Sequence, residues 1–169
     1  FWNQRMNGLT GKSEYIDILE RSLYNGALDG LSLSGDRFFY GNPLASRGQH
    51  QRREWFGTAC CPSNIARLVA SLGDYIYATA PDGIAVNLLV GSRTGVSAGG
   101  TRVNLGMETG YPWDGSVRLS LDPDRKARFK LYIRIPGWLI GKAVPGDLYI
   151  PAAAQAGAGT PVFRVNGKP

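Results

Sequence analysis

Two adjacent cysteines, Cys60 and Cys61, are the residues of this chain whose type and spacing most clearly suggest chemistry. They come directly before Pro62 and a helical pattern of apolar residues, and proline suits the first turn of a helix. Free N–H groups and a partial positive charge at a helix start favour a thiolate over a thiol. A thiolate can be a nucleophile or a metal ligand. The alternative is that both cysteines are small buried residues with a structural role.

A metal site at this pair needs further ligands. Zinc is bound tetrahedrally, so two cysteines leave half of the positions to other residues. His50 is the only histidine and lies in a polar loop over residues 41–53, so it could be a third ligand or an exposed loop residue. A redox role is disfavoured, because the usual redox spacing is Cys-x-x-Cys.

The N-terminal segment holds a weaker motif and several carboxylates. Gly11-Lys12-Ser13 resembles the end of a phosphate-binding loop, but Met6 stands where that loop needs a glycine. We therefore interpret these residues as a loop and helix cap. Asp17 is expected in the solvated first turn of the following helix, where its charge complements the helix dipole. From the residues alone, Glu20 is expected to be an exposed partner of Arg21 or of another neighbour.

Two segments with helical periodicity must position these residues. One runs from Ser13, a suitable N-cap, to about Asp29, and the other from Pro62 to about Ala78. Between them we predict a short hairpin over residues 31–40, built around a Ser-Gly-Asp turn, and the polar loop.

The second half of the chain has a hydrophobic period of two. Short strands are predicted at residues 84–90, 102–107, 116–121 and 129–135. This spacing predicts an antiparallel β-sandwich, followed by a loose loop from Ala152 to Gly159. We place the domain boundary between residues 79 and 80, with helices before it and strands after it.

Composition excludes several classes of protein. The 169 residues are 43% hydrophobic and 19% charged, which excludes intrinsic disorder, and two cysteines exclude a disulfide-rich scaffold. There is no run of about 18 apolar residues that could span a membrane. Most of the net charge of +6 lies in residues 79–169, which contain one basic cluster: Arg125, Lys126, Arg128, Lys130 and Arg134. No nucleic-acid-binding motif accompanies the cluster, so we expect no nucleic-acid partner. In this cluster, Lys130 and Arg134 alternate with apolar residues and are expected on the solvent face of a strand.

The segment from Trp55 to Arg67 closely resembles the Cys-Cys-Pro signature of the bacterial β-L-arabinofuranosidases, glycoside hydrolase family 127. Supporting matches follow the chain on both sides, at residues 15–26, 35–44, 86–88 and 134–138. The resemblance implies that residues 1–79 are the last helices of an (α/α)6 barrel carrying the Cys-Cys-Pro motif. It implies that residues 80–169 are the start of an antiparallel β-sandwich.

The resemblance also implies a function. Family members are retaining exo-enzymes that release L-arabinofuranose from β-linked arabino-oligosaccharides, with a zinc-bound cysteine as nucleophile. By motif match Cys60 would be the nucleophile, and Cys60 and Cys61 would be zinc ligands. Glu20 and Tyr40 would bind the sugar. The expected cofactor is zinc and the expected partner an arabinose-containing oligosaccharide, with no nucleic acid and no membrane.

This sequence departs from the family pattern in its missing residues. The family's acid/base glutamate and a Glu-x-Cys pair that completes the zinc site precede the matched segment, and neither has a counterpart here. Because the chain begins at Phe1 rather than Met and stops just after a strand-like stretch, we expect a fragment truncated at both ends and inactive alone. Free cysteines favour the cytoplasm, although a missing N-terminus could have carried a signal peptide for the periplasm or secretion.

Two other functions stay open at this point. One is a related glycosidase with another sugar specificity. The other is a non-catalytic carbohydrate-binding or interaction module in which Trp113 and Trp138 are stacking platforms. For both tryptophans, packing in the core is the preferred interpretation.

Overall fold

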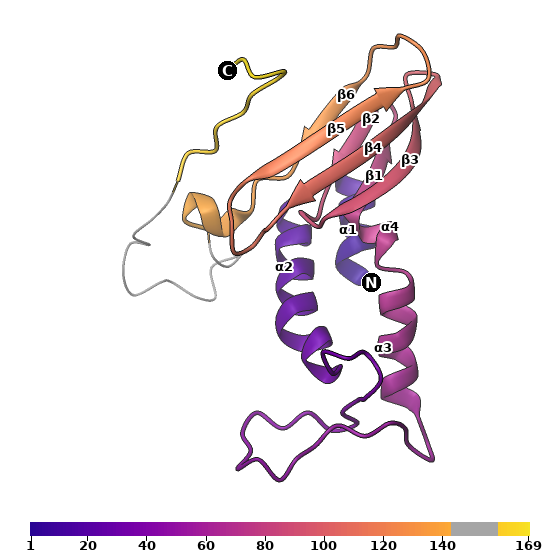
Figure 1. Ribbon diagram of the computed structural model, residues 1–169, viewed down its shortest axis with the longest axis vertical. Coiled ribbons are helices and arrows are strands. Elements are labelled where there is room, and N and C mark those ends of the chain that lie inside the picture. The colour runs from indigo at the N-terminus through magenta and orange to yellow at the C-terminus, as the bar shows by residue number, and fades with distance from the viewer. Residues whose placement is uncertain (143–158) are drawn as a thin grey trace. The chain divides into compact units, whose positions relative to one another are not determined.

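The computed structural model describes residues 1–142 and 159–169 (Figure 1). Contacts divide the chain into two compact units. Unit 1 comprises Phe1–Ile18 and Tyr75–Pro169, and unit 2 comprises Leu19–Asp74. The predicted loose loop at 152–159 lies outside the described residues apart from Gly159. No described helix has the length and apolar character needed to cross a bilayer.

Unit 1 begins with a helix that the sequence analysis did not predict, α1 (Trp2–Thr10). Its apolar residues form no clear stripe, which explains why periodicity missed it. Gly11 caps the helix: its φ of 69° lies in the left-handed region, and its N–H donates to the Asn7 carbonyl. Helix α2 (Glu14–Ser22) follows directly after Ser13 and continues into unit 2.

The strands of unit 1 form two three-stranded sheets (Figure 1). The first has the order β1-β2-β6, with β1 (Tyr77–Ala80), β2 (Gly83–Val86) and β6 (Lys130–Ile133). The second has the order β3-β4-β5, with β3 (Ser92–Ala98), β4 (Thr101–Thr109) and β5 (Val117–Pro123). Neighbours are antiparallel except β2 and β6, which are parallel, so the prediction of purely antiparallel strands is wrong for this pair.

One hydrophobic cluster joins the two sheets. Ile84 of β2 and Val103 of β4 are completely buried, and Leu105 is 2% exposed. Partly buried residues from the other strands pack against them, among them Tyr77, Leu119 and Leu131. The alternation of buried and exposed residues along β4 is the period-two pattern of a strand with one covered face. The assignment of these sheets to the start of a β-sandwich, and of the helices to a barrel, stays a prediction, as does the boundary at residues 79/80.

The expectation that Arg134 lies on a solvent face is wrong. Its side chain is 2% exposed, and its Nη1 lies 2.6 Å from Oδ1 of Asp17, whose side chain is only 14% exposed. Its Nε donates to the Asn87 carbonyl at 2.6 Å. Regular β6 ends at Ile133, so the period-two pattern no longer determines the next side chain. A buried arginine persists where a carboxylate and hydrogen bonds compensate for lost hydration, which also explains why Asp17 is not solvated.

The two tryptophans also differ from the sequence-based expectation of core packing. Trp113 is 94% exposed and follows β4 in a turn, where its N–H donates to the Gly110 carbonyl. Trp138 is 44% exposed. Its ring stacks on Tyr111 with centroids 6.1 Å apart, and its Nε1 donates to the Tyr111 hydroxyl. Core packing is therefore wrong for Trp113, and Trp138 is only partly covered.

Unit 2 contains the two predicted helical segments in interrupted form. The first continues from α2 through a π-helical turn, η1 (Leu23–Ala27), and a 3₁₀ turn, η2 (Leu28–Gly30). The second splits into α3 (Cys60–Ala70) and α4 (Gly73–Ile76), and the chain then enters β1. A Cβ at Gly30 would lie 2.8 Å from Cδ1 of Ile65, so glycine allows η2 to approach α3 closely.

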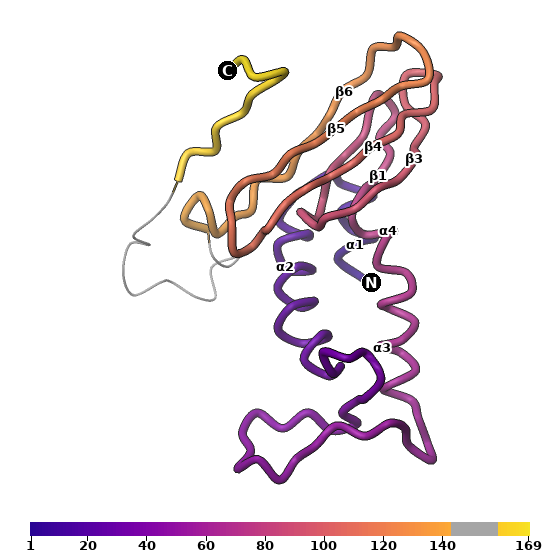
Figure 2. Tube along the Cα trace, in the orientation of Figure 1, coloured from indigo at the N-terminus to yellow at the C-terminus, as the bar shows by residue number. Residues whose placement is uncertain are grey.

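The segment between η2 and α3, residues 31–59, has no regular helix or strand and is an extended loop in Figure 2. The predicted hairpin reduces to one bridge between Leu31 and Phe38. Phe38 pairs in turn with Arg53, through backbone hydrogen bonds in both directions. These bridges close the polar loop at its base, and α3 with the two cysteines follows the loop in the sequence.

Candidate active site

The two cysteines are the first residues of α3 and do not precede it as predicted. The N-cap is Ala59, and Pro62 is buried in the third helical position, where its missing N–H is not needed. Both thiols are free and exposed. The interpretation of Cys60 and Cys61 as small buried residues is therefore wrong.

Side-chain hydrogen bonds secure the first turn of this helix. Ser63 Oγ donates to the Ala59 carbonyl at 2.6 Å, and Asn64 Nδ2 donates to the Cys60 carbonyl at 2.7 Å. Arg67 then donates to Asn64 Oδ1 at 2.6 Å. Sequence reasoning did not single out these polar residues, although Ser and Asn near a helix start are known to bond local backbone groups. They hold the backbone that carries the thiols.

Tyr40 contacts the first of the two thiols. Its hydroxyl oxygen lies 2.9 Å from Sγ of Cys60, and Cys60 Sγ lies 3.7 Å from Cys61 Sγ. The Tyr40 ring packs beside Phe56, with centroids 5.4 Å apart. The structure thus brings together three of the four predicted site residues, from the loop and the helix start.

These contacts distinguish the two thiols electrostatically. Hydrogen bonds from the Tyr40 hydroxyl and then from Cys61 stabilise the Cys60 thiolate, so the pKa of Cys60 lies below its usual value. The same bond to Cys60 raises the pKa of Tyr40. The hydrogen bond to Cys60 also raises the pKa of Cys61. In the absence of metal, Cys60 is the thiol that ionises first and is the better placed nucleophile.

The fourth predicted residue, Glu20, lies on α2. Its side chain is only 6% exposed, so the expectation that Glu20 is exposed is wrong. A carboxylate is rarely buried without a function or a partner. Its role in sugar binding stays a prediction.

The sulfur pair suits zinc as half of a ligand set. Two sulfurs bound to one tetrahedral zinc at 2.3 Å lie about 3.8 Å apart, close to the 3.7 Å between Cys60 and Cys61. Within the described residues no group of three His, Cys, Asp or Glu side chains could hold a metal. His50 therefore does not complete the set. Its Nε2 lies 2.7 Å from the Gly41 carbonyl oxygen, and its ring stacks on Phe39 at 4.6 Å.

An open cavity of about 990 Å³ lies beside Tyr40, within unit 2. Side chains between Arg37 and Phe56 form its wall. Tyr40 both lines this cavity and contacts Cys60, so this one residue connects the cavity wall to the thiol.

Comparison with protein families gives two consecutive matches. Residues 1–74 match the β-L-arabinofuranosidase GH127 catalytic domain, and residues 83–169 match the GH127 middle domain. The chain is 38% identical to a non-reducing end β-L-arabinofuranosidase of Bifidobacterium longum subsp. longum, over 82% of this chain. It spans only 23% of that relative's length.

Solved structures give the same result. A GH127 β-arabinofuranosidase superposes with a TM-score of 0.80 and 45% identity, over 86% of this chain and 23% of that one. A GH127 β-L-arabinofuranosidase from Geobacillus stearothermophilus T6 gives a TM-score of 0.71 and 43% identity, over 81% of this chain and 23% of that one. The arrangement of helices and sheets described above is thus similar to part of these larger chains.

Proposed function

Since this chain belongs to the β-L-arabinofuranosidase family GH127, we propose that the intact protein is a retaining glycoside hydrolase with Cys60 as its nucleophile. Its proposed reaction is the release of L-arabinofuranose from β-linked arabino-oligosaccharides. The observation that carries the proposal is the 2.9 Å contact between the Tyr40 hydroxyl and Cys60 Sγ, at an exposed helix start. A phenol donor there favours a thiolate that points into solvent beside a cavity.

The reaction has two displacements. Cys60 Sγ attacks the anomeric carbon, the bond from that carbon to the leaving oxygen breaks, and a general acid protonates this oxygen. Water then attacks the same carbon, the C–S bond breaks and Cys60 leaves as a thiolate. The acid residue accepts the proton of this water and is ready for the next cycle. Two inversions at one carbon give net retention.

Zinc is part of the proposal. Cys60 and Cys61 would hold it, as the spacing of their sulfurs allows. When bound, zinc keeps sulfur ligands deprotonated and fixed in position. The described residues contain no group of three side chains that could hold a metal. We therefore propose that residues of the intact protein beyond these 169 complete the zinc site and supply the acid. These 169 residues alone would then be inactive.

The test uses the intact protein and 4-nitrophenyl β-L-arabinofuranoside. Loss of the nucleophile in Cys60→Ala should lower kcat on the order of 10⁴-fold or more. Thr58→Ala is the matched control, since Thr58 is exposed two positions earlier in the chain. NMR of the first product should show the β-anomer, and elemental analysis about one zinc per chain.

Three results would contradict the proposal in different ways. Inversion at the anomeric carbon would exclude a covalent intermediate. Full activity of Cys60→Ala would exclude the thiolate nucleophile. Hydrolysis of another furanoside but not of the arabinoside would favour a related glycosidase with another sugar specificity.

A further inference from the structure

The cavity beside Tyr40 is larger than one reacting sugar requires. Its volume of about 990 Å³ is at the upper end of small-molecule sites, which typically enclose about 300–1,000 Å³. Tyr40 is shared between the cavity and the contact with Cys60. The cavity therefore has room for a second part of a substrate whose first part reacts at the thiol.

Aromatic rings form part of the cavity wall. Tyr40 is 43% exposed and Trp55 is 53% exposed, so both offer ring surface to a ligand. Their positions are supported from behind, since Trp55 packs edge-on against Phe38 at 5.6 Å and Tyr40 packs beside Phe56. Exposed, supported rings of this kind provide flat apolar surfaces with polar edges. They suit the C–H face of a sugar ring.

The cavity wall is also basic. Arg37, Arg52 and Arg53 line it, together with the carboxylate of Glu54. Glu54 is engaged with Arg37, whose Nη2 lies 2.8 Å from its Oε1. Among the residues that the structure describes, no ion pair joins Arg52 or Arg53 to a carboxylate. Two positive charges of the wall are thus left without a counterion.

The other partners of Arg52 and Arg53 are neutral. Arg52 donates from Nη2 to the Asp29 carbonyl at 2.5 Å, and its guanidinium lies 4.3 Å from the Phe39 ring centroid. Its Nε is buried and has no hydrogen-bond partner. Arg53 is fixed through its backbone, which bonds to Phe38 in both directions, while the residue as a whole is exposed. A fixed backbone with an exposed guanidinium is well suited to meeting a ligand carboxylate.

We propose that this cavity binds the leaving part of the substrate and selects a uronic acid there, with its ring on Trp55 or Tyr40 and its carboxylate on Arg53. The proposal rests on the proposed hydrolysis of a β-L-arabinofuranoside and departs from an arabino-oligosaccharide substrate in one respect: the part released with the arabinose is a uronic acid and not a second arabinose. Both features of the cavity wall are needed for this selection. The aromatic rings alone would accept a neutral sugar, whereas the arginines without a counterion favour a sugar that carries a carboxylate.

The test compares two disaccharides in the intact protein. In both, L-arabinofuranose is β-linked to the same hydroxyl, of glucuronic acid in one and of glucose in the other. The wild type should prefer the acid by about tenfold in kcat/KM, as expected for a charge-assisted hydrogen bond. Arg53→Gln should remove most of this preference, and Arg53→Lys should restore part of it. Added salt should weaken the preference in the wild type.

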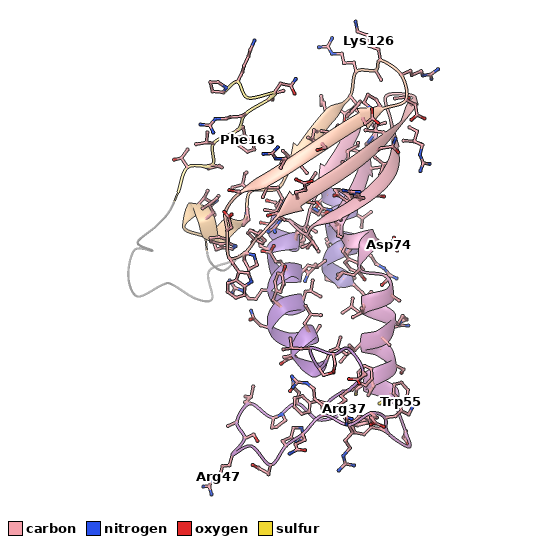
Figure 3. The ribbon with its side chains drawn as sticks, viewed as in Figure 1. Arg37, Arg47, Trp55, Asp74, Lys126 and Phe163 are labelled. Atoms are coloured by element: carbon pink, nitrogen blue, oxygen red, sulfur yellow. The ribbon has the colours of Figure 1, made fainter. Side chains whose placement is uncertain are left out.

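Arg47→Gln is the matched control. It removes the same charge from the same loop, but Arg47 does not line the cavity. Figure 3 shows Arg47 at the far tip of the loop, away from Arg37 and Trp55. The ratio of kcat/KM values for the two disaccharides should stay within about twofold of the wild type in Arg47→Gln. Equal losses in both variants would mean a general charge effect and would overturn the proposal.

Absence of any preference in the wild type would overturn it as well. If neither disaccharide is cleaved although 4-nitrophenyl β-L-arabinofuranoside is, the cavity proposal fails and the proposed hydrolysis stands. If none of the three is cleaved, the proposed hydrolysis fails, and calorimetry with glucuronate and glucose tests the cavity independently. Tighter binding of glucuronate than of glucose, lost in Arg53→Gln and kept in Arg47→Gln, would support the cavity proposal. Equal binding of the two sugars would contradict it.

Discussion

The strand region of unit 1 and the cysteine region of unit 2 differ in how far their side chains are exposed to solvent. In the strand region, Ile84 and Val103 are completely buried, and even the charged Arg134 is enclosed by Asp17 and a backbone carbonyl. In the cysteine region, both thiols and every residue from 41 to 51 are exposed. The first region gains its order from burial and the second from a few pairwise contacts.

This difference separates stability from reactivity. The contacts that place the site, such as Tyr40 with Cys60 and Phe39 with His50, involve exposed or half-exposed groups. Exposed contacts contribute little to folding, because water competes for the same groups. We therefore expect substitutions in the strand region to change the free energy of unfolding, and substitutions beside Cys60 to change chemistry.

Arg134→Met should have the largest effect on stability. It leaves the carboxylate of Asp17 buried without its partner, which costs about 3–5 kcal/mol of the free energy of unfolding. Urea denaturation measures this loss. Arg128→Met is the control, because Arg128 belongs to the same basic cluster but is exposed. Equal stability of the two variants would contradict the enclosed ion pair, and Asp17→Asn combined with Arg134→Met should recover part of the loss.

Leu105→Ala should follow in size. Leu105 is 2% exposed in the cluster between the sheets, and truncating a buried leucine costs about 2–5 kcal/mol. Its counterpart in unit 2 is Leu33→Ala, since Leu33 is fully exposed in the loop. That variant should stay within about 0.5 kcal/mol of the wild type. A loss at Leu33 as large as that at Leu105 would remove the contrast between the two regions.

Tyr40→Phe should scarcely change the free energy of unfolding, but it should change the pKa of the Cys60 thiol. It removes the donor that lowers the pKa of Cys60, so this pKa should rise. Below the pKa, less thiolate is then present at each pH. The pH profile of iodoacetamide alkylation, measured on chelator-treated protein in a Cys61→Ser background, should therefore move to higher pH. An unchanged profile, or one moved to lower pH, would contradict the role of Tyr40.

The spacing of apolar residues along the sequence predicted most of the regular helices and strands. The apolar stripes indicated α2 and α3, and alternation indicated β2, β4, β5 and β6. Strand β3 was missed because its sequence, Ser92 to Ala98, contains few large apolar residues. Helix α1 was missed for another reason, since its apolar residues form no clear stripe.

What could not be predicted depends on partners distant in sequence. Arg134 has a pattern typical of an exposed strand residue, and its burial follows from Asp17, which is 117 residues away. The cysteines were singled out from their position before a helix, whereas Tyr40 was identified only through the family resemblance. Its contact with Cys60 depends on the path of an irregular loop, which no periodicity describes. The cavity and its uncompensated arginines come from the same loop.

The most direct test of the proposed function is to find where the sugar becomes attached. Intact protein is mixed with 4-nitrophenyl β-L-arabinofuranoside, quenched in acid during the first turnovers, and digested for peptide mass spectrometry. We expect one arabinosyl group on Cys60, within the tryptic peptide that begins at Glu54 and ends at Arg67. An arabinosyl group on Cys61 or on a carboxylate, with none on Cys60, would contradict it.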